Sequence, residues 1–293
     1  MTVTKRAYAK INLYLDVVGK RPDGYHDLIS IMQKISLYDE IMITRSETLG
    51  IEITSDVEGL PLPPADNTNL IAKAAQVMFD NYNLSGSIAV KVNKRIPMGA
   101  GLGGGSSNAA EILKGIKDLY DLKISEDEIT RLAQKLGADV PFCLTDSFHP
   151  HLAEGIGEKL SPLCNALPKC CIVLVCPCIH VSTAEIFGQL TAYQQDKENL
   201  LCKFIHSVQN KDLHKMAVSV YNIFTTVTVN KFPLVGQCLQ LLSDLGAVGV
   251  NMSGTGSAVY GIFVDLPTAE AAREKLLSIA PYVYITQPFE RKI

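Results

Sequence analysis

The chain has 293 residues, of which 47% are hydrophobic and 19% charged, and its formal net charge at pH 7 is −3. This composition predicts a globular protein of about two domains and excludes an intrinsically disordered chain. The small net charge argues against nucleic acid or an acidic membrane surface as a partner. The N-terminus shows no apolar signal core, and no apolar run approaches the ~18 residues of a membrane span. We therefore expect a cytoplasmic protein, and no obligate protein partner is evident.

The first half of the chain mixes strand and helix patterns. Residues 7–19 alternate between apolar side chains and the polar side chains of Lys10, Asn12 and Asp16, which predicts a half-buried strand. The Pro-Asp-Gly sequence at residues 22–24 predicts a turn. Further strands are predicted at residues 28–37, 40–45, 50–54 and 87–92, and helices at residues 67–82, 106–120 and 125–137. The last of these helices begins with a capping box formed by Ser125 and Glu128 and ends at Gly137.

The second half follows a shift in composition at residues 158–168. Its patterns predict strands at residues 170–176, 247–251, 257–264 and 281–287, and helices at residues 183–190, 197–209, 212–225, 232–245 and 267–279. Elements of both kinds in each half favour two α+β domains over one doubly wound sheet.

Four of the eight cysteines lie between Cys170 and Cys178. Two of them are adjacent in a buried-strand pattern, and no second cluster of Cys and His has the spacing of a zinc finger. This pattern favours small core side chains in a reducing compartment over a metal site. The neighbouring His149 and His151 are expected to be solvated loop residues.

Five glycines occupy the seven positions from Gly99 to Gly105, and a helix pattern follows at once. Glycine permits positive φ and lets a ligand lie against successive backbone N–H groups. A simple turn before a helix would need one or two glycines, so this stretch predicts an anion site at a helix N-terminus. On this hypothesis, a side chain at Gly101 or Gly103 would stand where a phosphate must approach the backbone.

Two common nucleotide motifs fit this stretch less well. Residues 99–104 formally match the dinucleotide pattern, but residues 94–97 separate them from the preceding strand, and the required acidic residue is missing downstream. A Walker loop would place a lysine after its last glycine, where this chain has Ser106. A phosphate-binding nest followed by the hydroxyls of Ser106 and Ser107 remains, and hydroxyls suit phosphate oxygens or Mg²⁺.

Several long stretches together carry a resemblance to a known superfamily. They are AKINLYLDVVGKRPDGYHDL at residues 9–28, PMGAGLGGGSSNAA at 97–110, LGADVPFCL at 136–144, AEGIGEKL at 153–160 and GVNMSGTGSAVY at 249–260. The chain resembles the GHMP kinases, named for galactose, homoserine, mevalonate and phosphomevalonate substrates. Within them it closely resembles the branch that uses ATP to phosphorylate a CDP-linked methylerythritol in the non-mevalonate isoprenoid pathway.

The resemblance implies a two-domain α+β GHMP kinase fold that uses ATP and Mg²⁺. An N-terminal ATP-binding domain, expected over residues 1–160, would be similar to the second domain of ribosomal protein S5. A ferredoxin-like C-terminal domain, expected over residues 161–293, would complete the site for the small-molecule substrate.

The resemblance also implies roles for individual residues. Asp139, on a loop whose exit Pro141 fixes, would accept the proton of the acceptor hydroxyl, and Lys10 would keep that carboxylate ionised and orient the hydroxyl. Otherwise Asp139 would be interpreted as an Asx-turn residue and Lys10 as a solvated strand lysine. Ser107 is the expected Mg²⁺ ligand. The expected nucleotide-binding residues are Asn69, Pro97, Gly99, Gly101, Leu102, Gly103, Gly104, Gly105, Ser106 and Ser107.

A cytidine substrate needs flat rings to stack on and a polar group to bind its edge. We expect Tyr25 and Phe187 to sandwich the cytosine, His26 to hydrogen-bond its edge, and Asn12 and Thr183 to lie nearer the polyol. Phe187 also fits a helical apolar pattern, so a core position is the alternative. The turn at residues 253–257 is expected to support the phosphate end, with a plain glycine hairpin as the alternative.

Two other functions fit many of the same residues. The first is a GHMP kinase for a different small alcohol, such as mevalonate or homoserine, and the RPDGYH turn at residues 21–26 argues against it. The second is a nucleotide-binding sensor that has kept the fold and lost catalysis. The presence of both Lys10 and Asp139 argues against that function.

Overall fold

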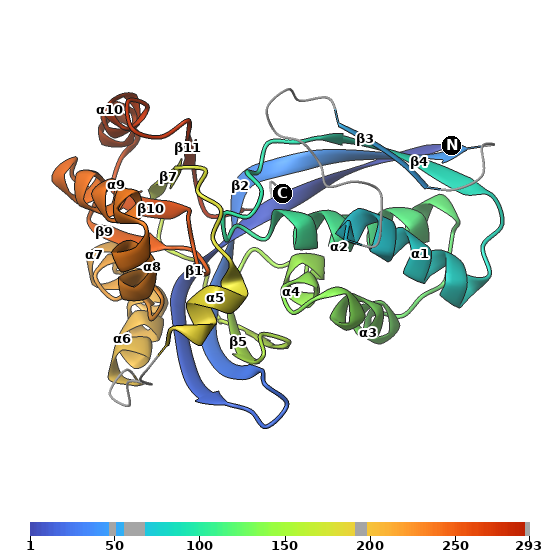
Figure 1. The fold of residues 1–293 in the computed structure, drawn as a ribbon, viewed down its shortest axis with the longest axis horizontal. Coiled ribbons are helices and arrows are strands. Elements are labelled where there is room, and N and C mark those ends of the chain that lie inside the picture. Colours follow the sequence, from blue (N-terminus) through green and yellow to red (C-terminus); the bar gives the residue numbers. More distant parts are fainter. Residues whose placement is uncertain (47–50, 56–67, 191–197, 291–293) are drawn as a thin grey trace. The chain divides into compact units, whose positions relative to one another are not determined.

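The structure, a computed structural model, describes residues 1–46, 51–55, 68–190 and 198–290 and divides into two compact units (Figure 1). The first unit comprises residues 1–9, 37–98 and 103–146, and the second comprises residues 10–36, 99–102 and 147–293. Strands β1 (Thr2–Lys20) and β2 (His26–Ser46) each contribute residues to both units. These units describe packing, and the division at residue 160 stays a prediction.

The first unit places helices on one face of a sheet (Figure 1). Strand β3 (Ile51–Ser55) pairs in parallel with β4 (Ser87–Asn93), which pairs antiparallel with the second half of β2. The helices are α1 (Leu70–Tyr82), α2 (Gly104–Leu119), α3 (Glu126–Leu136) and α4 (Val140–Leu144). Helix α2 approaches the sheet closely, because a Cβ on its Gly115 would lie 2.2 Å from Cδ1 of Ile43.

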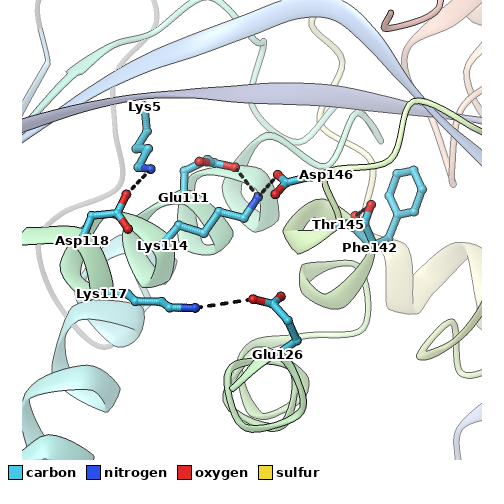
Figure 2. Close-up of polar contacts among 9 residues, drawn as sticks. All are labelled: Lys5, Glu111, Lys114, Lys117, Asp118, Glu126, Phe142, Thr145 and Asp146. Atoms are coloured by element: carbon cyan, nitrogen blue, oxygen red, sulfur yellow. Dashed lines mark hydrogen bonds and ion pairs between the residues drawn. The ribbon is translucent and has the colours of Figure 1, made fainter. Parts of the chain in front are cut away.

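Ion pairs hold helix α2 to its neighbours on the first unit (Figure 2). Lys5 of β1 pairs with Asp118 near the end of the helix, at 2.6 Å. Lys114 bridges Glu111 of the same helix and Asp146, at 3.3 and 2.7 Å. The helix that follows the glycine-rich stretch is therefore anchored well beyond its first turn.

The second unit contains a four-stranded antiparallel sheet in the order β11-β7-β10-β9. Its strands are β7 (Cys171–Cys176), β9 (Gly249–Met252), β10 (Val259–Phe263) and β11 (Tyr282–Thr286), and α9 (Pro233–Asp244) and α10 (Leu266–Leu276) pack on them (Figure 1). Strand β5 (His151–Gly155) pairs with β2 and β6 (Lys159–Pro162), and β8 (Tyr221–Asn222) pairs with β1. The other helices are α5 (Thr183–Gly188), α6 (Glu198–Gln209), α7 (Leu213–Ala217) and α8 (Thr225–Lys231).

Many of the predicted elements are present close to their expected bounds. The capping box is confirmed, because Oγ of Ser125 accepts a hydrogen bond from N of Glu128 at 3.2 Å and Gly137 follows the last residue of α3. The first residues of three predicted elements, at positions 50, 67 and 197, lie outside the described residues. Helix α1 takes Asn69 as its N-cap and begins at Leu70, three residues after the predicted start at residue 67.

Other predictions of secondary structure were wrong. The strands expected at 28–37 and 40–45 are one strand, β2, which passes through the buried Asp39. The helix expected at 212–225 is instead α7, β8 and the start of α8. The sequence did not predict the hairpin of β5 and β6 or the helix α4. Strand β1 was predicted to be half-buried, but residues 10–17 are buried on both faces of the strand.

Half of the thiols are core groups, while Cys164, Cys178 and Cys202 are exposed. The eight cysteines are free, and Cys143, Cys170, Cys176 and Cys238 are buried. Burial raises the pKa of Cys170 to about 12, so this thiol stays protonated at neutral pH. His151 does not fit the expected solvated loop, since it begins β5, is 4% exposed and has its pKa lowered by burial.

Helix α2, with 16 residues, is the longest helix in the described part of the chain. A membrane-spanning helix needs about 20 consecutive apolar residues. Within residues 1–46, 51–55, 68–190 and 198–290, none of the helices is long and apolar enough to cross a membrane.

Candidate active site

The glycine-rich stretch leads directly into helix α2. Gly99, Gly101 and Gly103 have φ angles of +64°, +80° and +66°, the left-handed region that glycine enters without strain. Gly103 is the N-cap of α2, so the helix begins at Gly104, two residues before the predicted start at Ser106. The first turn of a helix carries N–H groups that no helical carbonyl accepts, and its dipole favours an anion. In its own unit, this turn has the chemistry of a phosphate site.

The first part of the stretch packs against the turn at residues 253–257, which lies in the same unit. Oγ of Ser253 donates a hydrogen bond to O of Gly101 at 2.8 Å, and N of Ala258 donates to O of Ala100 at 3.1 Å. A Cβ on Gly101 would lie 2.1 Å from O of Ser253. This close approach explains the bare Cα of Gly101 without any ligand. The turn also joins the antiparallel strands β9 and β10, so it is a hairpin that contacts the glycine stretch.

Lys10 and Asn12 lie together, as expected for residues on one strand face. Lys10 is 4% exposed, which excludes the solvated-lysine alternative, and its Nζ donates to Oδ1 of Asn12 at 2.8 Å. The same oxygen accepts from N of Gly254 at 2.9 Å, and Nδ2 of Asn12 donates to Oγ of Ser30 at 2.9 Å. The backbone N of Lys10 donates to O of Leu102 at 2.9 Å. Strand β1 is thereby tied to both the glycine stretch and the 253–257 turn.

Sequence reasoning missed Asn222, whereas Ser253 lies in the 253–257 turn that was expected to support the phosphate end. Asn222 donates from Nδ2 to O of Met252 at 2.8 Å and to O of Gly254 at 2.7 Å. These two hydrogen bonds fix the backbone of the 253–257 turn. Ser253 accepts from N of Asn12 at 3.3 Å while its hydroxyl donates to Gly101. No signal in the sequence could identify Asn222, because it lies in a stretch that was interpreted as the interior of a helix.

Asp139 lies in the turn that connects α3 to the short helix α4, as the sequence predicted, and it is the N-cap of α4. Pro141 lies in the first turn of that helix, where proline is tolerated because its missing N–H has no helical partner. The side chain of Asp139 makes no capping hydrogen bond to the described helix, while its carbonyl accepts from N of Cys143 at 3.1 Å. The backbone thus fixes the position of Asp139 without using its carboxylate as the helix cap.

Asn69, Pro97 and Ser107 are all buried in the first unit. Oδ1 of Asn69 accepts from N of Ile71 at 2.9 Å and so caps α1. Oγ of Ser107 donates to O of Tyr8 at 2.7 Å, and Ser107 itself is 2% exposed. The neighbouring Ser106 is half-buried and Gly105 is exposed. The first turn of α2 therefore combines accessible backbone with one hydroxyl that is already donating.

Two of the residues predicted to bind cytosine lie side by side in the second unit. The rings of His26 and Phe187 have centroids 5.0 Å apart, and Phe187 also contacts the buried Phe224 at 4.5 Å. Tyr25 is 60% exposed on the turn before β2. Oγ1 of Thr183 lies 3.3 Å from Oγ1 of Thr255, which connects α5 to the 253–257 turn. The structure thus pairs Phe187 with His26. Its contact with the buried Phe224 also agrees with the alternative, in which Phe187 is a core residue.

Family models match two parts of the chain. The model of the GHMP kinases N terminal domain matches residues 69–147, and the GHMP kinases C terminal model matches residues 204–281. A 4-diphosphocytidyl-2-C-methyl-D-erythritol kinase of Clostridium novyi is 40% identical over 96% of this chain and 98% of its own length. The enzyme of the same name from Syntrophotalea carbinolica is 42% identical over 93% of each. The chain belongs to this family of GHMP kinases.

Solved structures agree with the assignment. A crystal structure of 4-(cytidine 5'-diphospho)-2C-methyl-D-erythritol kinase matches this GHMP kinase with a TM-score of 0.83 and 29% identity, covering 98% of this chain and 100% of that chain. The mevalonate kinase of L. major matches at a TM-score of 0.74 and 17% identity, which shows a shared fold alone. The chain is therefore an ATP-dependent phosphotransferase with the two-domain α+β fold that the sequence predicted.

The described part of the chain contains no group of three or more His, Cys, Asp or Glu side chains that could hold a metal ion. Mg²⁺ in kinases commonly takes most of its ligands from phosphates and water, with few from protein. The hydroxyl of Ser107 fits such a minor role, because its proton is directed at Tyr8 and its oxygen keeps lone pairs for a cation.

Proposed function

We propose that this GHMP kinase transfers the γ-phosphoryl group of ATP to the 2-hydroxyl of 4-diphosphocytidyl-2-C-methyl-D-erythritol, in the non-mevalonate isoprenoid pathway. The observation that carries the proposal is the cluster of Lys10, Asn12 and Ser253, which joins strand β1 to the glycine stretch by hydrogen bonds of 2.8–3.3 Å. Relatives of nearly equal length that carry this substrate in their name support the choice of acceptor.

Phosphoryl transfer to an alcohol needs the hydroxyl oriented in line with the γ-phosphate and relieved of its proton. We assign the second task to the carboxylate of Asp139, which the backbone of α4 positions. Lys10 supplies a positive charge and helps to orient the hydroxyl. Asn12 holds the ammonium of Lys10 from the side, so this charge has a fixed place on strand β1.

The nucleotide site in this proposal is the glycine stretch with its flanking residues. The backbone from Gly99 to Ser107 receives the phosphates at the N-terminus of α2. Pro97 and Asn69, both buried in the first unit, border the nucleotide. Ser107 would be the protein ligand of Mg²⁺, which supplies charge neutralisation of the phosphates when it is bound.

One assay distinguishes the proposed acceptor from the alternatives. The protein is mixed with ATP and Mg²⁺, and ADP release is followed with the CDP-linked methylerythritol, with mevalonate and with homoserine. Turnover with the CDP-linked substrate alone is expected. Turnover with another alcohol would identify a GHMP kinase of different specificity, and ATP binding without turnover on any alcohol would identify a sensor.

Removing an aromatic ring from the cytosine site is expected to weaken binding of the CDP-linked substrate. Because stacking contributes ~1–3 kcal/mol per base, Tyr25→Ala or Phe187→Ala should raise KM for this substrate roughly tenfold or more. KM for ATP should stay nearly unchanged. Steady-state kinetics with each substrate varied in turn measures both constants.

Conservative variants separate stacking from packing at these positions. Phe187→Leu keeps apolar volume against Phe224 but removes the ring, so it should show the high KM of Phe187→Ala with a smaller loss of thermal stability. Tyr25→Phe keeps the ring and should behave as wild type. A wild-type KM in Phe187→Leu would assign this side chain to the core alone. A rise in KM for ATP instead would mean that the two nucleotide sites are interchanged.

A further inference from the structure

A buried ion pair lies next to the glycine stretch in the first unit. Asp39, in the middle of β2, is 0% exposed, and Lys94, which directly follows β4, is 3% exposed. Nζ of Lys94 donates to Oδ2 of Asp39 at 2.8 Å. Asp39 is also where the sequence wrongly predicted a break in the strand. A charged pair at this depth needs a reason, because apolar side chains of similar size are often at least as stable there.

The ion pair fixes the backbone of residues 95–96, which lead into the glycine stretch. Oδ1 of Asp39 accepts from N of Arg95 at 2.7 Å and from N of Ile96 at 2.8 Å. Nζ of Lys94 donates to the carbonyl O of Ile96. Both the N–H and the C=O of Ile96 are therefore held by the pair, so the segment before Pro97 has little freedom.

The same pair lies against the first residue of helix α2. A Cβ on Gly104 would lie 3.4 Å from Nζ of Lys94 and 3.0 Å from Cγ2 of Ile96. A cation beside the N-terminus of a helix is unfavourable for the helix dipole, whereas it favours an anion bound there. Helix stability therefore does not explain the position of Lys94, which Asp39 and the carbonyl O of Ile96 hold. The charge of its ammonium is compatible with an anionic ligand at the first turn of α2.

We infer that Lys94 and Asp39 are positioning residues for the phosphate-binding turn of this kinase. They hold residues 95–96, and Lys94 packs against Gly104. The first N–H groups of α2 are thereby preorganised for the phosphates of a nucleotide. This inference rests on the proposed binding of ATP at that turn. It gives a role to residues 94–96, whose insertion before the glycines had no explanation in the sequence.

Direct titration of ATP into the folded variants tests the inference. Lys94→Met is expected to weaken ATP binding roughly tenfold or more, because small displacements of a positioning group have large effects on a bound ligand. KM for the acceptor alcohol should change less than about twofold, since the proposed cytosine site is formed by Tyr25, His26 and Phe187 and not by this turn. If Lys94 only stabilised the fold, its substitution would lower the unfolding temperature without weakening ATP binding more than binding of the acceptor alcohol.

The double variant Lys94→Met/Asp39→Asn guards against misfolding. It leaves no unpaired buried charge, and the amide oxygen of asparagine can still accept from N of Arg95 and Ile96. The matched control is Lys5→Met, which removes the ion pair with Asp118 at the far end of α2 (Figure 2) and should leave ATP affinity unchanged. Wild-type ATP affinity in the folded double variant would overturn the inference. Failure of the wild-type protein to bind ATP would overturn the proposed function as well.

Discussion

Asp139→Asn is expected to lower kcat by roughly 10²–10⁴-fold, the effect of removing a positioned proton acceptor. The substitution is nearly isosteric, and the helix α4 does not use the Asp139 side chain as its cap, so the fold should be retained. An amide cannot take the hydroxyl proton, whereas binding of ATP at the turn of α2 does not need it. We therefore expect the loss in kcat with little change in ATP affinity.

Lys10→Ala is expected to reduce kcat on the same scale, roughly 10²–10⁴-fold, because it removes the ammonium that we propose orients the acceptor hydroxyl. Oδ1 of Asn12 keeps its bond from N of Gly254 at 2.9 Å, so the cluster around the turn should remain in place. Single-turnover kinetics on both variants separates the phosphoryl-transfer step from substrate binding. Circular dichroism establishes that each variant is folded.

A carboxylate and a lysine away from the proposed site serve as controls. Asp146→Asn changes an 82% exposed side chain that pairs with Lys114, and Lys5→Ala changes the pair with Asp118 (Figure 2). Exposed ion pairs contribute little to stability, so both variants should keep wild-type kcat. Near-wild-type turnover in Asp139→Asn or Lys10→Ala would remove the assigned role from that residue.

Local signals account for the parts of the fold that the sequence predicted well. A capping box depends on residues three positions apart, as Ser125 and Glu128 are, and the left-handed glycines before α2 are a property of the backbone alone. Such features can be recognised in any sequence. The assignment to the GHMP kinases similarly came from long uninterrupted motifs rather than from the pattern of elements.

Contacts between distant residues account for what the sequence did not predict. Oδ1 of Asn12 binds N of Gly254, 242 residues away, and Lys94 binds Asp39, 55 residues away. Asp39 looked like a strand break because a charged residue interrupts an apolar run. The distant lysine, together with the N–H groups of Arg95 and Ile96, satisfies the buried carboxylate. For the same reason the alternation of β1 did not reveal that its polar face is covered by the 253–257 turn.

Gly101→Val is expected to lower the free energy of unfolding more than valine at Gly19 or Gly24. A Cβ at Gly101 would lie 2.1 Å from O of Ser253, and the φ angle is +80°. Overpacking costs typically ~1–3 kcal/mol, and a strained backbone conformation adds about 1–3 kcal/mol. The displaced 253–257 turn would also disturb the glycine stretch, so ATP binding should weaken as well. Chemical denaturation and ATP titration measure the two effects.

Three other glycines separate the causes in this prediction. Gly19→Val meets no atom within 4 Å and needs no left-handed φ, so it should leave stability nearly unchanged. Gly24→Val also meets no atom but has a φ of +89°, so it measures the backbone term alone. Gly103→Val, at the N-cap of α2 with a φ of +66°, should weaken ATP binding because a side chain there would crowd an approaching phosphate.

Equal unfolding free energies for Gly24→Val and Gly101→Val would show that the contact with Ser253 is not tight in solution. Unchanged ATP affinity in both Gly101→Val and Gly103→Val would move the phosphate site away from this turn.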